Sequence, residues 1–162
     1  MPKENKISNR PTHVRCVWGL VCSLSSIDQQ RNNLSLFNVI DQLNIPIAFK
    51  KQAEVAKSEV IELGLEHEVV FLLRRTLSIE LCSDLLILDM KLSLADPTGK
   101  ILSELLRPLE FKPGNRVLRY RVQNNIFRIS SEGDYVYRAE ISYQGSNKFE
   151  LVAEVPFNVQ FI

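Results

Sequence analysis

The sequence has few cysteines and they are poorly placed for a disulfide framework or a zinc site. Its 162 residues include three, Cys16, Cys22 and Cys82. The odd number, with no Cys-x-x-Cys pair, argues against both arrangements. A free cysteine is usually a small buried apolar residue, and free thiols are typical of the reducing cytoplasm. We therefore expect a cytoplasmic protein.

Histidine is scarcer still. His13 and His67 are the only two, and they lie in different segments, whereas a metal site usually needs three or four ligands with close local spacing. His67 stands between Glu66 and Glu68, and neighbours on a strand point to opposite faces. The pattern predicts a surface histidine near carboxylates, no metal site and no cofactor.

Catalytic motifs are also missing. The sequence has no Gly-x-Ser-x-Gly nucleophile turn, and its six glycines stand singly rather than in a phosphate-binding loop. A Cys16 or Cys22 nucleophile would need one of the two histidines as its base, and such groups assemble in space rather than in sequence. We therefore predict no catalytic residue, and an enzyme with a spatially assembled site stays open as an alternative.

Long apolar runs are absent as well. None approaches the roughly 20 residues that span a bilayer, and the charged first residues lead into no apolar segment, which argues against a secretory signal. The formal net charge is +1, which gives no overall attraction to nucleic acid or to an anionic membrane. We expect no membrane partner.

What the sequence does contain is a series of strand-like segments. The clearest are residues 133–143 and 148–161, which flank a turn of Gly, Ser and Asn and so predict a β-hairpin. Pro- and Gly-containing turns separate several of the others. The remaining segments with strand composition are residues 13–27, 34–43, 59–75, 85–95, 101–111 and 117–129.

These segments predict an all-β protein, because no long helices alternate with them. We expect a single antiparallel β-sandwich domain of about eight strands over residues 13–162, with a β-barrel as the alternative. Residues 50–58 have good helix propensity and predict either one short helix or an irregular crossover. The polar residues 1–12 are expected to form a flexible N-terminal tail.

The run Gly133-Asp134-Tyr135-Val136-Tyr137 resembles the late strands of immunoglobulin-like sandwiches. In that family a Gly-x-Tyr element opens a strand and the tyrosine hydroxyl bonds back to the backbone. The resemblance implies that Tyr135 is this corner tyrosine. No cysteine stands two residues later, and Trp18 lies in the first strand segment rather than the third, so the resemblance concerns the fold only.

The overall layout is similar to a family of small bacterial β-sandwich proteins of unknown function. The shared features are Ser25-Ser26-Ile27-Asp28, then Leu34-Ser35-Leu36-Phe37-Asn38-Val39-Ile40-Asp41, and the closing Gly-Asp-Tyr strand with residues 151–157. The resemblance implies a bacterial β-sandwich. It implies no activity, cofactor or catalytic residue.

One segment has a strong excess of positive charge. Residues 107–128 contain six arginines and lysines and one acidic residue, Glu110. A basic sheet face with aromatic neighbours is able to hold nucleic-acid phosphates, whereas cross-strand pairing with acids, such as Glu104, Glu132 or Glu140, would be structural. The candidate nucleic-acid-binding residues are Arg116, Arg119, Arg121 and Arg128.

A sandwich has open edges, which are either blocked or used to add a strand from another chain. Pro46, Pro108 and Pro156 are candidate blocking residues. The hypothesis that we favour is a non-enzymatic protein-interaction or assembly module with a protein partner or a homo-oligomeric state. A nucleic-acid-binding module is the second hypothesis.

Overall fold

A computed structural model describes residues 12–77 and 82–162 of the chain. The described residues form eleven strands and one short helix, so the all-β prediction is confirmed. Residues 1–11 of the predicted tail lie outside the described residues. Its last residue, Thr12, is buried and donates a hydrogen bond of 3.0 Å from Oγ1 to Glu150 Oε2.

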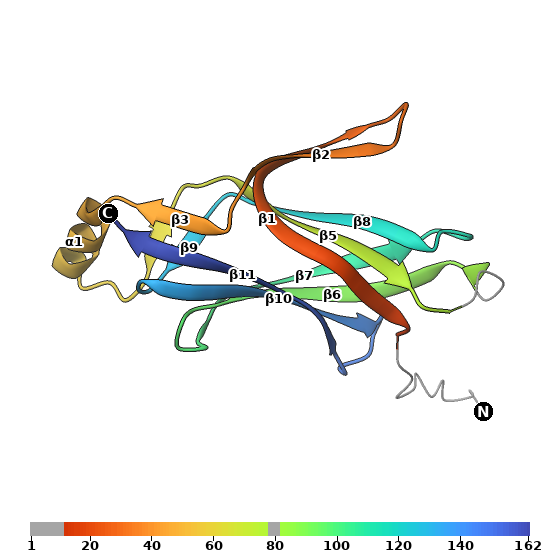
Figure 1. Cartoon of the computed structure of the whole chain (residues 1–162). Coiled ribbons are helices and arrows are strands. Elements are labelled where there is room, and N and C mark those ends of the chain that lie inside the picture. The colour runs from red at the N-terminus through yellow and green to blue at the C-terminus, as the bar shows by residue number, and fades with distance from the viewer. Residues whose placement is uncertain (1–11, 78–81) are drawn as a thin grey trace.

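The strands form two large sheets (Figure 1). The four-stranded sheet has the order β2 (Asn33–Val39), β1 (Val14–Asp28), β5 (His67–Arg75), β8 (Val117–Asn124). The five-stranded sheet has the order β3 (Gln42–Ile45), β11 (Glu150–Phe161), β10 (Gly133–Tyr143), β6 (Leu86–Ala95), β7 (Ile101–Phe111). A separate pair joins β4 (Ile61–Leu63) to β9 (Phe127–Ile129).

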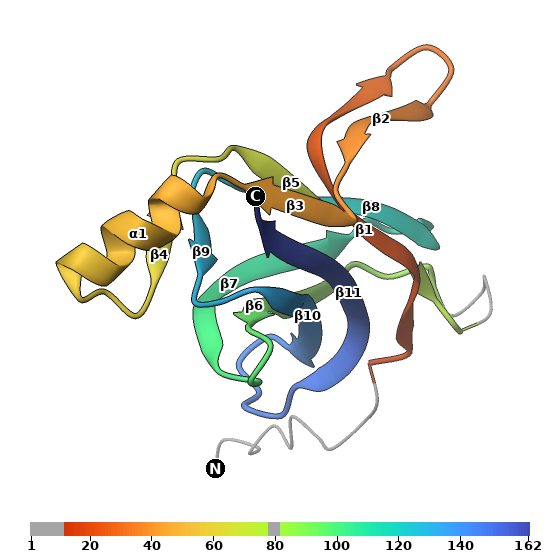
Figure 2. The same cartoon turned by 60° about the vertical axis from the view of Figure 1, so that its left-hand side comes forward.

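The sheets approach each other on one side, where β1 lies against β11. The five-stranded sheet curls strongly (Figure 2). On the other side, β7 and β8 belong to different sheets and do not pair. The architecture is therefore a sandwich whose two sheets pack closely along one side, whereas along the other β7 and β8 are linked by a hydrogen bond of 2.8 Å from the Tyr120 hydroxyl to the Pro108 carbonyl rather than by strand pairing.

The strand number exceeds the prediction because three predicted segments are each divided in two. Residues 34–43 become β2 and β3, which belong to different sheets. Asn38 has a φ of 50° just before this division. Residues 59–75 and 117–129 divide in the same way, into β4 and β5 and into β8 and β9.

The sheets are also not wholly antiparallel, since β3 pairs with β11 in parallel. The chain leaves the four-stranded sheet after β2 and enters the five-stranded sheet as β3, beside β11.

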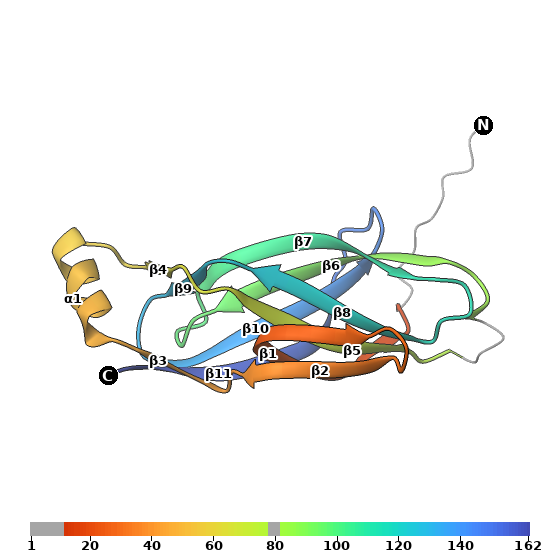
Figure 3. The same ribbon diagram turned by 90° about the horizontal axis from the view of Figure 1, so that it is seen from above.

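The predicted short helix is present as α1 (Ile47–Ala56), at one end of the molecule beside the C-terminus (Figure 3). It begins after Pro46 and ends at Lys57, which has a left-handed φ of 53°. The N–H groups of Lys57 and Ser58 close the last turn on carbonyls of Glu54 and Ala53, a common way to end a helix. No helix in the described part of the chain is long and apolar enough to cross a membrane.

The core lies between the sheets and contains large aromatic and aliphatic side chains, among them Phe71, Phe111 and Phe127. β11, the second strand of the predicted hairpin, contributes the buried Phe157 and Val159 to this core.

The corner tyrosine is confirmed. Tyr135 is 1% exposed. The backbone N–H groups of Ser130 and Ser131 donate to its hydroxyl oxygen at 2.9 Å and 3.0 Å, and the hydroxyl donates to the carbonyl of Ser131 at 2.7 Å. The immunoglobulin-like resemblance thus identified this local structure correctly.

Candidate functional site

The four predicted arginines do not gather at one place. Arg119 and Arg121 share the outer face of β8, because they are two residues apart on one strand. Arg116 precedes β8 and donates from Nε to the carbonyl oxygen of Arg75 at 3.4 Å. Arg128 lies on β9 and forms an ion pair of 2.8 Å from Nε to Glu62 Oε1 on β4.

Arg119 and Arg121 both contact the β1–β2 hairpin. Arg119 donates from Nη1 to Asn32 Oδ1 at 2.8 Å. Arg121 donates from Nη1 to the carbonyl and hydroxyl oxygens of Ser25, each at 3.2 Å. Three of the four arginines thus bond to neutral oxygens and one to a carboxylate. The acids proposed as partners from the sequence are not those found, and a nucleic-acid role for these arginines stays a prediction.

In Figure 2 the tip of the β1–β2 hairpin projects outward, while its hydrogen bonds with Arg119 and Arg121 connect the hairpin to β8. The first part of β1 pairs with β5 and the last part, from Cys22 to Asp28, pairs with β2. The base of the hairpin is linked to β5 by a hydrogen bond from Ser25 Oγ to Glu68 Oε2. Ser25 and Glu68 are both buried, so one side of the hairpin faces the four-stranded sheet.

The other side of the hairpin is apolar and open. Leu24 lies opposite Phe37 in the β1–β2 register, and Val39 follows two residues later. These three side chains are 54%, 49% and 54% exposed. We call Leu24, Phe37 and Val39 the hairpin patch. Single exposed apolar side chains are normal on protein surfaces, whereas an adjacent group of this kind is a candidate contact surface.

The hairpin patch borders an unblocked strand edge. β2 is the outer strand of its sheet, and its sequence Asn-Leu-Ser-Leu-Phe-Asn-Val contains no charged residue and no proline. β7 and β8, in contrast, carry charges, and β7 also contains Pro108. β3 has four residues only. Natural sheets usually protect their edges with charges, prolines or short strands, and β2 has none of these.

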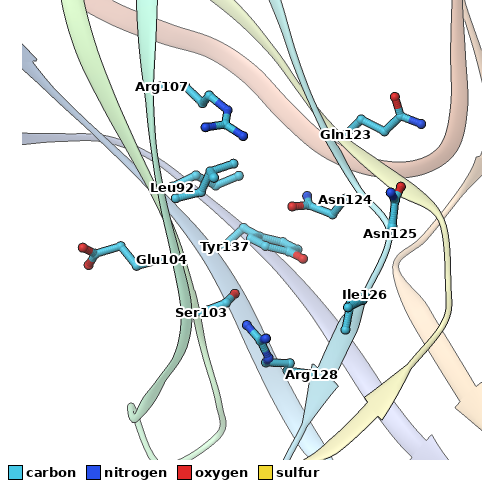
Figure 4. Close-up of a pocket in the computed structure, with 11 residues that line it drawn as sticks. Leu92, Ser103, Glu104, Arg107, Gln123, Asn124, Asn125, Ile126, Arg128 and Tyr137 are labelled. Atoms are coloured by element: carbon cyan, nitrogen blue, oxygen red, sulfur yellow. The ribbon is translucent and has the colours of Figure 1, made fainter.

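A second candidate site is the cleft where the two sheets stay apart. We call it the β7–β8 cleft (Figure 4). It has a volume of about 310 Å³. Its floor contains Leu92 and Tyr137 from the five-stranded sheet. The walls are mainly polar. The lining residues are Leu92, Ser103, Glu104, Leu105, Arg107, Gln123, Asn124, Asn125, Ile126, Arg128 and Tyr137.

Strand alternation places Ser103 and Arg107 on the core-facing side of β7, together with Leu109 and Phe111, and Glu104 on the opposite side. Figure 4 agrees, because the Glu104 carboxylate points away from Tyr137. On β8, Asn124 shares the core-facing side with Val122. The Asn124 Nδ2 atom is buried and has no hydrogen-bond partner within the described residues.

Tyr137 and His67 form a buried pair behind the cleft. His67 Nδ1 lies 2.9 Å from the carbonyl oxygen of Leu65, and its Nε2 lies 2.7 Å from the Tyr137 hydroxyl. A carbonyl oxygen only accepts, so Nδ1 carries the proton and Nε2 accepts from the Tyr137 hydroxyl. Burial lowers the pKa of His67 and raises that of Tyr137, which keeps both groups neutral.

The structure corrects the expectation that His67 is a surface histidine, since it is 0% exposed. The flanking charges of Glu66 and Glu68 suggested a solvated position. Instead, Glu68 is itself buried under the β1–β2 hairpin. No group of three or more His, Cys, Asp or Glu residues that could hold a metal ion occurs in residues 12–77 and 82–162.

Among the polar residues of the cleft, only Arg128 is predicted from the sequence as a binding residue, and Glu104 is named only as a possible ion-pair partner. Arg107 lies in the basic segment of residues 107–128 but is not among the four candidate arginines. The run Gln123-Asn124-Asn125 was the available signal: three consecutive amides interrupt a strand pattern where the chain leaves one sheet and enters another.

No protein-family model matches the sequence, and a search of curated proteins finds no match. The similarity to a family of small bacterial β-sandwich proteins therefore stays a prediction.

Solved structures of similar fold include two that match over most of this chain. One is the alkylpurine DNA glycosylase AlkC of Pseudomonas fluorescens, bound to DNA containing an abasic site analogue, with 12% identity and a TM-score of 0.50. The match covers 93% of this chain but only 31% of the glycosylase chain. The other is the C-terminal domain of Wzt, with 7% identity, a TM-score of 0.51, and coverage of 91% of this chain and 74% of that chain. At these identities the likeness concerns the fold alone.

Proposed function

We propose that this protein is a non-enzymatic assembly module of the bacterial cytoplasm, and that a second copy of the chain pairs with β2. The observation that carries the proposal is the unblocked edge of β2 beside the hairpin patch of Leu24, Phe37 and Val39. A strand added to such an edge gains main-chain hydrogen bonds, and neighbouring apolar side chains add buried area.

The composition of β2 favours a second copy of the chain as the occupant. In a two-fold symmetric pair the same surface contacts itself, so β2 would lie antiparallel to β2 of the other copy. An edge strand that carried charges of one sign would bring these charges close together in such a pair, and they would repel. β2 has no charged residue, and the hairpin patch would be brought close to the patch of the other copy.

The proposed location in the cytoplasm is supported by the absence of disulfide bonds among the described cysteines. Cys16, Cys22 and Cys82 are all free cysteines, as is usual in a reducing compartment.

The first test is the self-association of the wild-type protein and of Phe37→Lys, measured by sedimentation velocity over a range of concentrations after nuclease treatment. We expect a wild-type dimer. The Phe37→Lys variant should raise the dimer dissociation constant at least about tenfold, because it removes apolar contact and places two ammonium groups near the symmetry axis. Phe37 is about half exposed, so the fold should tolerate the change.

The matched control is Leu106→Lys on β7, since Leu106 is 55% exposed and lies on the outer strand of the other sheet. This variant should dimerise like the wild type. A wild-type protein that stays monomeric, or a dimer that Leu106→Lys and Phe37→Lys weaken equally, would contradict the proposal. A parallel run without nuclease completes the test, and association seen only in that run would favour the nucleic-acid hypothesis instead.

A further inference from the structure

We infer that the β7–β8 cleft is a binding site for a small hydroxylated organic anion, one that carries a carboxylate or phosphate group. The inference is independent of β2 and of self-association. It rests on the polar groups that two sheets and the β4–β9 pair bring to one cavity, and on two donors in it that have few partners in the protein.

The first of these donors is Arg107. It lies on the cleft side of β7 and is exposed. Its guanidinium donates a hydrogen bond of 3.4 Å from Nη1 to the adjacent carbonyl of Leu106. No carboxylate in the described part of the chain lies within ion-pair distance of it. An arginine presents a planar fork of donors that matches a carboxylate or phosphate in two-point contact.

The second donor is the Asn124 side-chain amide, across the cleft from β7 (Figure 4). Its Nδ2 is buried without a hydrogen-bond partner among the described residues. Leaving a buried donor unsatisfied destabilises a folded protein, and an acceptor on a bound molecule would satisfy it. Arg128 adds positive charge at the other end of the cleft, although its Nε is shared with Glu62.

The floor of the cleft favours a ligand that also carries hydroxyl groups. Tyr137 uses its only proton in the hydrogen bond to His67 Nε2, so its oxygen is able to offer only lone pairs to a ligand. Ser103 on β7 both donates and accepts. The donors on the walls suit the anionic group of a ligand. The acceptor on the floor suits a hydroxyl group of the same ligand.

The size of the cleft limits the ligand. Its volume of about 310 Å³ lies at the lower end of the range for small-molecule sites, which suits a molecule of one sugar ring in size. A nucleic-acid strand or a polypeptide would extend far outside it.

The test compares glucuronate, glucose 6-phosphate and glucose as ligands of the full-length protein by isothermal titration calorimetry. The three share one hydroxylated ring, and only the first two are anions. We expect both anions to bind at least about tenfold more tightly than glucose. Inorganic phosphate serves as a fourth probe and should bind more weakly than glucose 6-phosphate, because it lacks the frame.

Two variants locate the site. Arg107→Gln should weaken binding of both anions at least about tenfold, since it removes the unpaired guanidinium. Asn124→Asp has nearly the same shape and should weaken them similarly, because it places a carboxylate in the cleft. Arg119→Gln, on the outer face of β8 and away from the cleft, is the control and should bind like the wild type.

Thermal melting of each variant separates loss of binding from loss of folding. The inference is overturned if neither anion binds with a dissociation constant of about 1 mM or lower. It is also overturned if glucose binds as tightly as the anions, or if Arg107→Gln and Arg119→Gln give the same affinity.

Discussion

At the scale of single residues, His67 is a neutral histidine held inside the core. Its ring centroid lies 4.7 Å from that of Phe127, and both of its nitrogens are hydrogen-bonded. Desolvation lowers its pKa from the usual 6.5, and the hydrogen bond to the Leu65 carbonyl opposes this in part. A second proton would put an unpaired charge in an apolar environment and break the hydrogen bond from Tyr137.

We predict that this histidine makes the protein less stable as the pH falls below about 6.5. The unfolded chain takes up a proton near pH 6.5, whereas folded His67 does so only at a lower pH. Between the two pKa values the unfolded state binds more protons, so the free energy of unfolding decreases as the pH falls, with a limit of about 1.4 kcal/mol per pH unit for one group. Urea unfolding at about pH 7.5 and about pH 5.5 measures it.

The control for this prediction is the other histidine. His13→Gln, at an exposed position, should keep the pH dependence, and His67→Gln should lose it even if its overall stability is lower. The Asp96 carboxyl does not affect the pH dependence of the free energy of unfolding in this range. Burial alone would raise its pKa, but hydrogen bonds from Thr98, Ser130 and the Lys100 N–H hold it at about 2, so its contribution changes only in a more acid range. An unchanged slope in His67→Gln would contradict the assignment.

His67 and Tyr135 show which residues a sequence is able to place. Tyr135 was predictable because its role depends on a local pattern, a glycine two residues before it and a turn of Ser130 and Ser131. The burial of His67 depends on Tyr137, which is 70 residues away in sequence. Its immediate neighbours, two glutamates, pointed to the surface, and only long-range packing decides otherwise.

At the scale of elements, β1 connects most of the features described above. It pairs with β5 and then with β2, and it lies against β11 of the other sheet. A shift of register between Cys16 and Trp18 reverses which side chains face the core. Cys16 pairs with the core residue Leu73 and Cys22 with Glu68, so the two cysteines do not share a face as regular alternation would predict.

The same shift turns Gly19 toward the core, where β1 meets β11. A Cβ atom added at Gly19 would lie 2.8 Å from Phe71 Cδ1 and 2.8 Å from Val155 Cγ2, and both of these side chains are buried. We predict that Gly19→Ala lowers the free energy of unfolding by about 1–3 kcal/mol, because the added methyl group overpacks a closed contact. Urea unfolding of the purified variant measures the loss.

Gly64→Ala is the matched control, since a Cβ atom there has no neighbour within 4 Å. It should change the free energy of unfolding by no more than about 0.5 kcal/mol. Equal losses in the two variants would show that the contact between β1 and β11 is looser than the structure indicates.

Element boundaries divide into two kinds by their predictability. Turns that return the chain within one sheet were predictable, as at residues 96–100 and 144–147, because Gly, Pro, Asn and Asp mark them. Crossings between sheets were predictable only where such residues also mark them, as Pro113 and Gly114 do between β7 and β8. Residues 40–41 join β2 to β3 through hydrogen bonds to Val21 and Asn158, partners distant in sequence, and the chain carries no strong turn signal there. The β7–β8 cleft arises at another such crossing, after β8, which explains why most of its residues were missed.

At the scale of the whole molecule, the two sheets share one core. The link is Phe127 on β9, a strand that pairs with neither large sheet. Its ring lies 4.7 Å from that of His67 in the four-stranded sheet. It also lies 5.2 Å from the ring of Phe157, with an edge-on angle of 82°, in the five-stranded sheet. A residue that packs against both sheets couples their stability.

We predict that the protein unfolds in a single transition, and that Phe127→Ala lowers the free energy of unfolding by about 3–5 kcal/mol while keeping that transition single. Two signals follow the sheets separately. Trp18, the only tryptophan, lies in β1, and three of the four tyrosines lie in β10. Trp fluorescence and tyrosine near-ultraviolet circular dichroism should therefore give the same midpoint in urea.

The control is Phe149→Ala, because Phe149 is half-buried and its ring lies 4.7 Å from Lys91 Nζ rather than between the sheets. Its loss should cost about 1 kcal/mol, in the range of an exposed cation–π contact. If Phe127→Ala separated the two signals, each sheet would have a stable core of its own. If both signals shift together, Phe127 belongs to one shared core, and the cleft between β7 and β8 is an opening in a single cooperative unit.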